Sequence, residues 1–133
     1  MNILKFLKPK STIVWLKEDD TLRQAIERIK PHSYTAVPVV ANDGKYKGTV
    51  TEGDLLRYIV KVGDYDLHGF EHVPINEILR DGFNPAIDIQ ATRDTVIDRI
   101  SNQNFLPVCD DRGMFVGIIT RRDLIRYLAG IED

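Results

Sequence analysis

The stretch VPVVANDGKYKGTVTEGDLLRYI, residues 37–59, decides the fold because the chain repeats it. Residues 106–128 read LPVCDDRGMFVGIITRRDLIRYL, and nine of the 23 aligned positions are identical at this offset of 69. A weaker match at an offset of 71 continues the alignment upstream to Thr21 and Thr92. Internal self-similarity of this kind is typical of a chain built from copies of one supersecondary unit. The sequence therefore predicts two related units.

Each copy predicts the same order of elements: strand, helix, strand, tight turn, strand and helix. In the first copy, residues 12–16 are β-branched and apolar as in a strand, and residues 22–29 place apolar side chains at helical spacing. Residues 36–50 read as a hairpin around the turn sequence Asn-Asp-Gly. Residues 51–62 then read as a helix, and the Gly-, Asp- and His-rich residues after it as an exposed connector.

The size of the repeat bears on how the copies pack. A unit of about 60 residues is too small to bury a sufficient core by itself. We therefore expect an α+β fold in which two β-α-β-β-α repeats pack together through their sheets. The first copy covers residues 8–62, the connector residues 63–75 and the second copy residues 76–133.

Composition and charge exclude several classes of protein. Eighteen basic and twenty acidic residues give a net charge of −2, which supplies no general positive field to hold DNA. Apolar runs such as residues 36–41 are far shorter than the roughly 20 residues of a membrane-spanning helix, and Lys5 and Lys8 interrupt any signal-peptide core. The single cysteine, Cys109, cannot form an internal disulfide. We expect a cytoplasmic protein that binds neither DNA nor membrane.

Both copies carry the run Gly-x-x-Thr-x-x-Asp after an apolar-Pro-Val strand and a turn glycine. The run is formed by Gly48, Thr51 and Asp54 in the first copy and by Gly117, Thr120 and Asp123 in the second. In these residues, and over about residues 11–128, the chain resembles a tandem pair of CBS motifs, named after cystathionine β-synthase and often called a Bateman module. The resemblance implies a pseudo-twofold pair of small units whose clefts bind adenosine compounds and so regulate an attached or associated protein.

The Thr-x-x-Asp run also has a purely structural interpretation. Thr followed three residues later by an acidic residue, just before an apolar helix, is close to a capping box, so both runs could serve only to satisfy free amides. However, a helix start also offers amides to an anion, and an aspartate there can accept hydrogen bonds from ribose hydroxyls. Two matching copies in the family's strand and turn context favour ligand contact in at least one cleft.

The resemblance implies two clefts, each assembled from the helix start of one copy and the leading residues of the other. For the first cleft it implies Thr12, Ile13, Tyr34, Thr35, Ala36, Thr120, Arg121, Arg122 and Asp123. For the second cleft it implies Thr51, Glu52, Asp54, Asn84, Pro85, Asn104, Phe105 and Leu106.

The two clefts differ in charge. Two arginines beside the first helix start suit bidentate phosphate recognition, whereas Glu52 and Gly53 stand at the same positions of the second. We therefore expect the phosphate of a ligand in the first cleft. We also expect Arg121 to begin an exposed turn and to contribute little to stability.

Other candidate sites are weaker. His68 and His72 have a spacing that suits a metal on one helical face, but Gly69 interrupts it, and we expect no metal site. The sequence shows no glycine-rich phosphate loop, nucleophile elbow or HExxH motif, so we expect neither catalysis nor a catalytic cofactor. A small enzyme acting on a nucleotide or phosphate ester remains an alternative.

The leading hypothesis is a regulatory module. We expect it to bind an adenine nucleotide, whether AMP, ADP, ATP or cyclic di-AMP, and to signal to a partner protein whose identity the sequence does not give. We expect a homodimer, because apolar side chains on the helices would leave a surface that finds a partner. The residues expected on that surface are Leu55, Ile59, Leu124 and Leu128. The alternative is a structural dimerisation module with no small-molecule ligand.

Overall fold

The chain forms two compact α+β units, and each unit combines residues from both copies of the repeat. The computed structural model describes residues 2–29, 35–63 and 67–131. Unit 1 comprises residues 1–13 and 84–133, and unit 2 comprises residues 14–83. The α+β class is confirmed. The leading residues 8–13 of the first copy therefore belong to the unit that holds the second hairpin.

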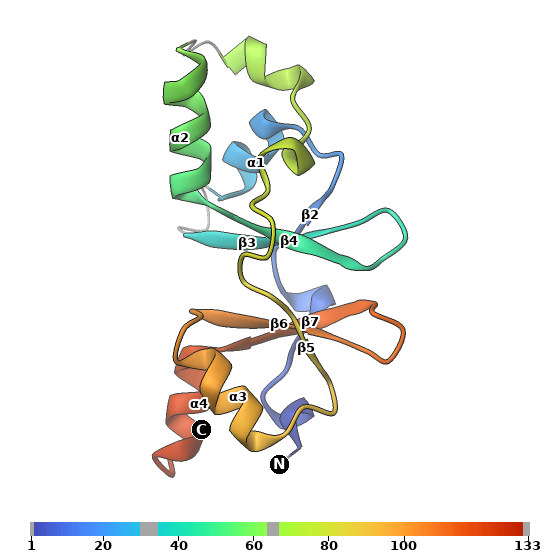
Figure 1. Cartoon of the computed structure of the whole chain (residues 1–133), viewed down its shortest axis with the longest axis vertical. Helices are drawn as coiled ribbons and strands as arrows, with labels where there is room; N and C mark the ends of the chain where they lie inside the picture. Colours follow the sequence, from blue (N-terminus) through green and yellow to red (C-terminus); the bar gives the residue numbers. More distant parts are fainter. Residues whose placement is uncertain (1, 30–34, 64–66, 132–133) are drawn as a thin grey trace. The chain divides into compact units, whose positions relative to one another are not determined.

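Unit 2 contains a three-stranded sheet in the order β2-β3-β4 (Figure 1). Strand β2, Leu16–Lys17, runs parallel to β3, and β3 pairs antiparallel with β4 in the predicted hairpin. The other elements are β3 (Ala36–Val40), β4 (Tyr46–Thr51), α1 (Leu22–Ile29) and α2 (Glu52–Val62). The turn chemistry and the Thr51 cap are local signals, so the sequence places β3, β4 and α2 within a residue.

The residues after α2 are part of the core of unit 2, and the expectation of an exposed connector is wrong. They form two 3-10 turns, Leu67–His72 and Ile75–Ile78. Phe70 is only 3% exposed, and Ile75 is fully buried. The N–H of Leu22, at the start of α1, donates to the carbonyl of Val73 at 2.7 Å. Burying a phenylalanine stabilises by about 1.5–3 kcal/mol, which outweighs the polar composition of this segment.

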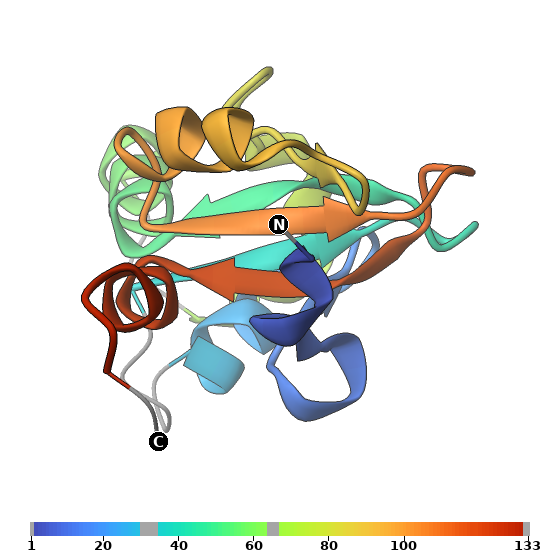
Figure 2. The same ribbon diagram turned by 90° about the horizontal axis from the view of Figure 1, so that it is seen from below.

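Unit 1 contains a four-stranded sheet in the order β1-β7-β6-β5. Figure 2 shows the N-terminal segment, in blue, beside β7, in red. The strands are β1 (Lys8–Pro9), β5 (Ile87–Asp88), β6 (Phe105–Cys109) and β7 (Phe115–Thr120), and the helices are α3 (Arg93–Ile100) and α4 (Arg121–Leu128). Two short 3-10 turns, Ile3–Lys5 and Lys10–Thr12, flank β1.

The leading segment of the first copy differs from its prediction. Residues 12–16 were expected to be a strand, but Lys10–Thr12 is a 3-10 turn and β2 begins at Leu16. The residues of the first copy that pair with β7 lie upstream of this segment, in β1, where Pro9 lies opposite Gly117. A Cβ on Gly117 would overlap the carbonyl oxygen of Lys8, so glycine permits the close approach of the two backbones.

The apolar faces of α2 and α4 also need one correction. Leu55 and Leu124 were expected at a dimer surface, but they are 6% and 1% exposed and lie in the cores of their own units. The next residues along each helix, Leu56 and Ile125, are 63% and 57% exposed. A step of one residue turns a helix by about 100°, which separates the buried from the exposed face. In the described part of the chain no helix is long and apolar enough to span a membrane.

Candidate functional site

The helix start of unit 2 is a complete capping box. The Thr51 hydroxyl oxygen accepts a hydrogen bond from the Asp54 N–H at 3.1 Å. In return, Asp54 Oδ2 accepts from the Thr51 N–H and from the Thr51 hydroxyl, both at 2.9 Å. Two free amides at the start of α2 are thereby satisfied, as the structural interpretation of Thr-x-x-Asp expects.

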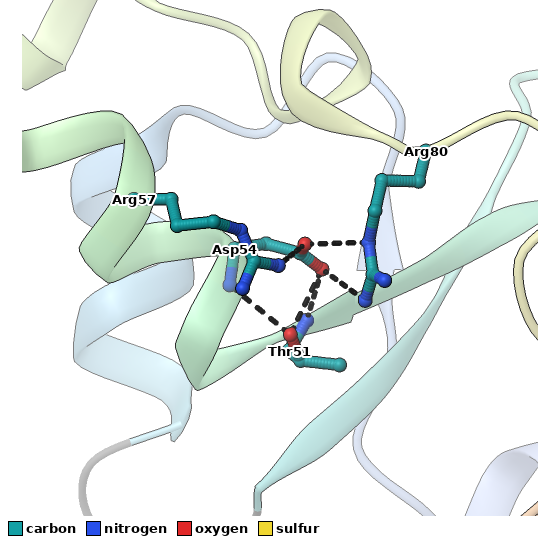
Figure 3. Close-up of polar contacts among 4 residues, drawn as sticks. All are labelled: Thr51, Asp54, Arg57 and Arg80. Atoms are coloured by element: carbon teal, nitrogen blue, oxygen red, sulfur yellow. Dashed lines mark hydrogen bonds and ion pairs between the residues drawn. The ribbon is translucent and has the colours of Figure 1, made fainter. Parts of the chain in front are cut away.

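Two arginines close on the same carboxylate (Figure 3). Arg57 Nη2 lies 2.5 Å from Asp54 Oδ1, and Arg80 places Nε 2.7 Å from Oδ1 and Nη2 3.4 Å from Oδ2. The Arg80 guanidinium also lies over the ring of Phe83, 3.7 Å from its centroid. Both oxygens of Asp54 therefore have charged partners, and its side chain is 3% exposed.

The environment of Asp54 keeps its carboxylate ionised. Burial alone raises the pKa of Asp54. Hydrogen bonds from the backbone and hydroxyl of Thr51, and from Arg80 and Arg57, outweigh burial and hold this pKa below its ordinary value. The carboxylate is thus a fixed part of the fold of unit 2, with little capacity left to accept a hydrogen bond from a ligand.

The helix start of unit 1 has the same residues but different contacts. The Thr120 hydroxyl oxygen accepts from the Asp123 N–H at 3.2 Å, so the threonine caps α4. Within the described ranges the Asp123 carboxylate has one charged partner, Lys8, whose Nζ lies 3.7 Å from Oδ2. The Asp123 side chain is 30% exposed, and that of Lys8 is 49% exposed. Such an exposed pair is worth at most about 1 kcal/mol, so Asp123 can accept new hydrogen bonds.

A pocket of about 310 Å³ adjoins Asp123 within unit 1. The N-terminal segment forms one wall of the pocket, and α4 forms the other. The rings of Phe6 and Tyr127 meet across these walls with centroids 4.5 Å apart. The lining residues are Lys5, Phe6, Leu7, Lys8, Asp123, Arg126, Tyr127 and Ile131.

Arg121 contributes to the fold of unit 1, and the expectation that it begins an exposed turn is wrong. Its Nε donates to the Ile100 carbonyl at 3.2 Å, and its Nη2 donates to the Gln103 carbonyl at 3.0 Å. The carbonyls at the end of a helix such as α3 lack intrahelical partners, and a guanidinium can satisfy them. Arg121 is half-buried, whereas Arg122 is exposed.

A buried glutamine that the sequence did not single out joins several predicted residues. Gln103 Nε2 donates to Asn84 Oδ1 at 2.8 Å and to the Pro85 carbonyl at 3.1 Å. Asn84 is 8% exposed and has a φ of 54°, a conformation that asparagine tolerates better than most residues. The N–H of Arg121 donates to the Asn104 carbonyl at 3.1 Å, as that of Glu52 donates to Thr35 at 3.0 Å in unit 2.

The residues of the two predicted clefts are divided between the units. In unit 1 lie Thr12, Ile13, Thr120, Arg121, Arg122 and Asp123 of the first cleft. Thr35 and Ala36 of that cleft lie in unit 2, and Tyr34 lies outside the described residues. Thr51 and Asp54 of the second cleft lie in unit 2, and Asn84, Pro85, Asn104 and Phe105 lie in unit 1. The assembly of either cleft from both units stays a prediction.

Four charged residues at these helix starts were not predicted as site residues. They are Lys8, Arg57, Arg80 and Arg126. Arg57 and Arg126 align in the repeat, which is a signal that could have been used. Lys8 and Arg80 each come from a leading segment, and no local pattern marks them. Within the described ranges no three His, Cys, Asp or Glu side chains gather as metal ligands would.

The fold and the two Thr-x-x-Asp helix starts define a tandem repeat protein of one known family. The family model "CBS domain" matches residues 6–61 and 70–130, and the chain therefore belongs to the CBS domain family. A CBS domain-containing protein of Dictyostelium discoideum is 27% identical over 98% of this chain and 94% of its own length.

Solved structures show the same fold. The crystal structure of CbpB in complex with cyclic di-AMP matches with a TM-score of 0.87 and 23% identity, over 98% of this chain and 85% of that one. The structure of CBSX2 in complex with AMP matches with a TM-score of 0.75 and 18% identity, over 97% of this chain and 96% of that one.

Proposed function

We propose that this protein is a regulatory module that binds an adenine nucleotide and signals its occupancy to a partner protein. AMP, ADP, ATP and cyclic di-AMP are the candidate ligands. Membership in the CBS domain family supports the proposal, as do the nucleotide complexes of two proteins with the same fold. The nucleotide acts as a regulatory ligand and not as a catalytic cofactor, and a cytoplasmic location is part of the proposal.

The open carboxylate of Asp123 is the observation that carries the proposal. Ribose hydroxyls are donors that need an acceptor, and Asp123 stands at a helix start with one loosely paired cation. Thr12 and Ile13, also expected at the ligand, lie in the same unit. Asp54, at the equivalent position, is enclosed by four donor groups. We therefore assign the nucleotide to the helix start of unit 1, at one ligand per chain.

Isothermal titration calorimetry with AMP, ADP, ATP, cyclic di-AMP and adenosine tests this assignment. Asp123→Ala should weaken the bound nucleotide roughly ten- to hundredfold, because two charge-assisted hydrogen bonds to ribose are lost. Asp111→Ala is the matched control, since Asp111 is exposed in the turn between β6 and β7 of the same unit. Absence of binding by every ligand at millimolar concentration would refute the proposal, and equal binding by both variants would refute Asp123 as the ribose acceptor.

Exposed apolar side chains on α2 and α4 support self-association as a second part of the proposal. Leu56 and Val60 are 63% and 60% exposed, and Ile125 and Leu128 are 57% and 45% exposed. Apolar side chains repeated along one helix face usually pack against a partner. We propose a homodimer through these faces. Sedimentation should give a dimer for the wild type and a monomer for Leu56→Glu or Ile125→Glu, and a wild-type monomer at tens of micromolar contradicts it.

The same surface also favours the structural alternative, a dimerisation module without a ligand. That alternative expects the same dimer and no binding of any adenine nucleotide. The calorimetric titration and the sedimentation measurement together separate the two functions.

A further inference from the structure

The pocket beside Asp123 gathers positive charge in a chain whose net charge is −2. Among the described lining residues, Lys5, Lys8 and Arg126 carry positive charge and Asp123 is the one carboxylate. Other cations of unit 1, such as Arg112 in the turn between β6 and β7, lie outside the pocket lining. Converging cations around a concave surface concentrate the field and attract anions.

The two lysines are held in place by the fold of unit 1. Ile3 is 1% exposed and anchors the first turn, and the Asn2 side chain accepts from the Leu4 N–H at 3.0 Å. Lys8 lies in β1, where it pairs with Ile118 of β7. The contact between Phe6 and Tyr127 joins the same segment to α4. Cations on a fixed backbone lose less entropy on binding than cations on a loop.

We propose that the phosphate of the ligand is bound in this pocket by Lys5, Lys8 and Arg126. The proposal rests on the assignment of ribose to Asp123, and it moves the phosphate away from Arg121 and Arg122, where the sequence predicts it. Arg121 donates to the carbonyl of Ile100, the last residue of α3, and to that of Gln103 beyond the helix, so it is already engaged in the fold.

The pair between Lys8 and Asp123 explains how one ligand can use both charges. At 3.7 Å the pair is long for a charge-assisted hydrogen bond, which is about 2.7–2.9 Å. A phosphate that takes Lys8 releases Asp123, whose oxygens then accept from the ribose hydroxyls of the same molecule. The ligand class is thus a ribose phosphate with the phosphate and the sugar on opposite sides of this ion pair. The pocket volume of about 310 Å³ is at the lower end of small-molecule sites, about 300–1,000 Å³, and suits a ribose phosphate group.

The test compares AMP with adenosine, because the two differ only in the phosphate. The wild type should bind AMP more tightly than adenosine. Lys5→Ala, Lys8→Ala and Arg126→Ala should each reduce AMP affinity by roughly tenfold. Lys5→Ala and Arg126→Ala should leave adenosine affinity unchanged, whereas Lys8→Ala, which also frees Asp123, should not lower it. Lys5 decides the result most clearly, because it is exposed and its substitution leaves the fold intact. Lys5→Arg should keep the preference for AMP.

Two exposed cations outside the pocket provide matched controls. Arg112→Ala in unit 1 and Lys45→Ala in the turn of the unit 2 hairpin should bind AMP as the wild type does. If the pocket variants also keep the wild-type preference for AMP, the phosphate is bound elsewhere, and the assignment of this pocket is overturned while the nucleotide module stands. Equal wild-type affinity for AMP and adenosine overturns the pocket as well.

Inorganic pyrophosphate separates failure of the pocket from failure of the proposed function. It carries no adenine or ribose, so its binding reports only the cations. If neither AMP nor adenosine binds but pyrophosphate binds in a manner that depends on Lys5, the nucleotide function is wrong and the anion pocket is right. If neither the nucleotides nor pyrophosphate binds, both are wrong.

Discussion

Asp54 in unit 2 and Asp123 in unit 1 occupy the same position of the repeat, yet their surroundings are opposite. The carboxylate of Asp54 is enclosed by its capping box and by two guanidinium groups, whereas that of Asp123 faces a pocket and one loosely paired ammonium. The motif is the same in both, so the difference arises from what surrounds it. The state of such a site depends on the neighbouring segments as much as on Thr-x-x-Asp.

The leading segments account for most of that difference. Arg80 contacts Asp54 through two nitrogens and is held over the ring of Phe83, whereas Lys8 reaches Asp123 with a single nitrogen. A guanidinium matches a carboxylate in two parallel hydrogen bonds and stacks on aromatic faces, and an ammonium does neither as well. An arginine in the leading segment closes the site in unit 2, and a lysine leaves the site in unit 1 open.

Replacing Asp54 and Asp123 in turn should give the largest difference in the free energy of unfolding between the two units. Asp54→Ala removes the reciprocal cap and the partner of two arginines, so it should lower the free energy of unfolding by about 2–4 kcal/mol. Asp123→Ala should cost less than about 1 kcal/mol, because the cap of α4 uses the backbone N–H of Asp123. Urea denaturation of both variants measures the difference. Equal losses would mean that the two sites are closed to the same degree.

Gly48 and Gly117, which begin the two Gly-x-x-Thr-x-x-Asp runs, should tolerate replacement by alanine to different degrees. A Cβ on Gly117 would overlap the Lys8 carbonyl oxygen in the β1–β7 pair, whereas a Cβ on Gly48 would contact only the Leu79 side chain at 3.4 Å. Gly117→Ala should therefore destabilise by about 1–3 kcal/mol and displace the N-terminal segment. Gly48→Ala should stay within about 1 kcal/mol of the wild type. Thermal unfolding of both variants checks the expectation, and a greater loss for Gly48→Ala contradicts it.

Glu52 and Arg121, which follow Thr51 and Thr120, should give a smaller difference in stability when each is replaced by alanine. Arg121→Ala leaves the carbonyls of Ile100 and Gln103 without this donor, and it should cost about 1–2 kcal/mol of stability. Glu52→Ala, at the same position in unit 2, removes only a favourable charge at the helix start, worth about 0.3–1 kcal/mol. Chemical denaturation measures both changes. If Arg121→Ala leaves the free energy of unfolding unchanged, the two hydrogen bonds of Arg121 make no net contribution to stability.

The pH dependence of stability should report the ionisation of the Asp54 carboxylate. Because the pKa of Asp54 is lowered in the folded protein, its contribution is present above the unfolded pKa, about 3.9, and is lost as the pH falls through the lower folded value. The stability difference between wild type and Asp54→Asn should thus be constant above about pH 5 and shrink below about pH 4. Urea titrations from pH 2 to pH 7 measure it, and a difference independent of pH contradicts the lowered pKa.

Local signals were sufficient to predict the hairpins and the helices that follow them. The turn at residues 42–44 and the cap at Thr51 lie within the elements that they define, so β3, β4 and α2 were predicted almost to the residue. The predicted exposure of the segment after α2 was wrong, because the structure of this segment depends on burial of Phe70 in the core that also includes α1. No pattern within that segment distinguishes a packed turn from an exposed one.

The contacts of the site residues, too, could be predicted only as far as local patterns and the repeat reach. The two aspartates follow from the repeat, but the residues that set their states lie in distant parts of the sequence. Arg80 is 26 residues from Asp54, and Lys8 contacts Asp123 from the other end of the chain. Gln103 aligns with no similar residue in the first copy, so neither periodicity nor the repeat could indicate its role. Such contacts follow from topology.

The N-terminal residues 1–13 belong to the unit formed by residues 84–133, and this arrangement fixes an order for folding during synthesis. All of unit 2 is contained in residues 14–83, so it can form before the second hairpin has been made. The N-terminal strand must wait for β7, because Pro9 pairs with Gly117 more than 100 residues later. At about 5–20 residues per second this wait is roughly 5–20 s. Closing so long a loop costs about 4 kcal/mol of chain entropy, and until it closes the side chain of Ile3 has no core to enter.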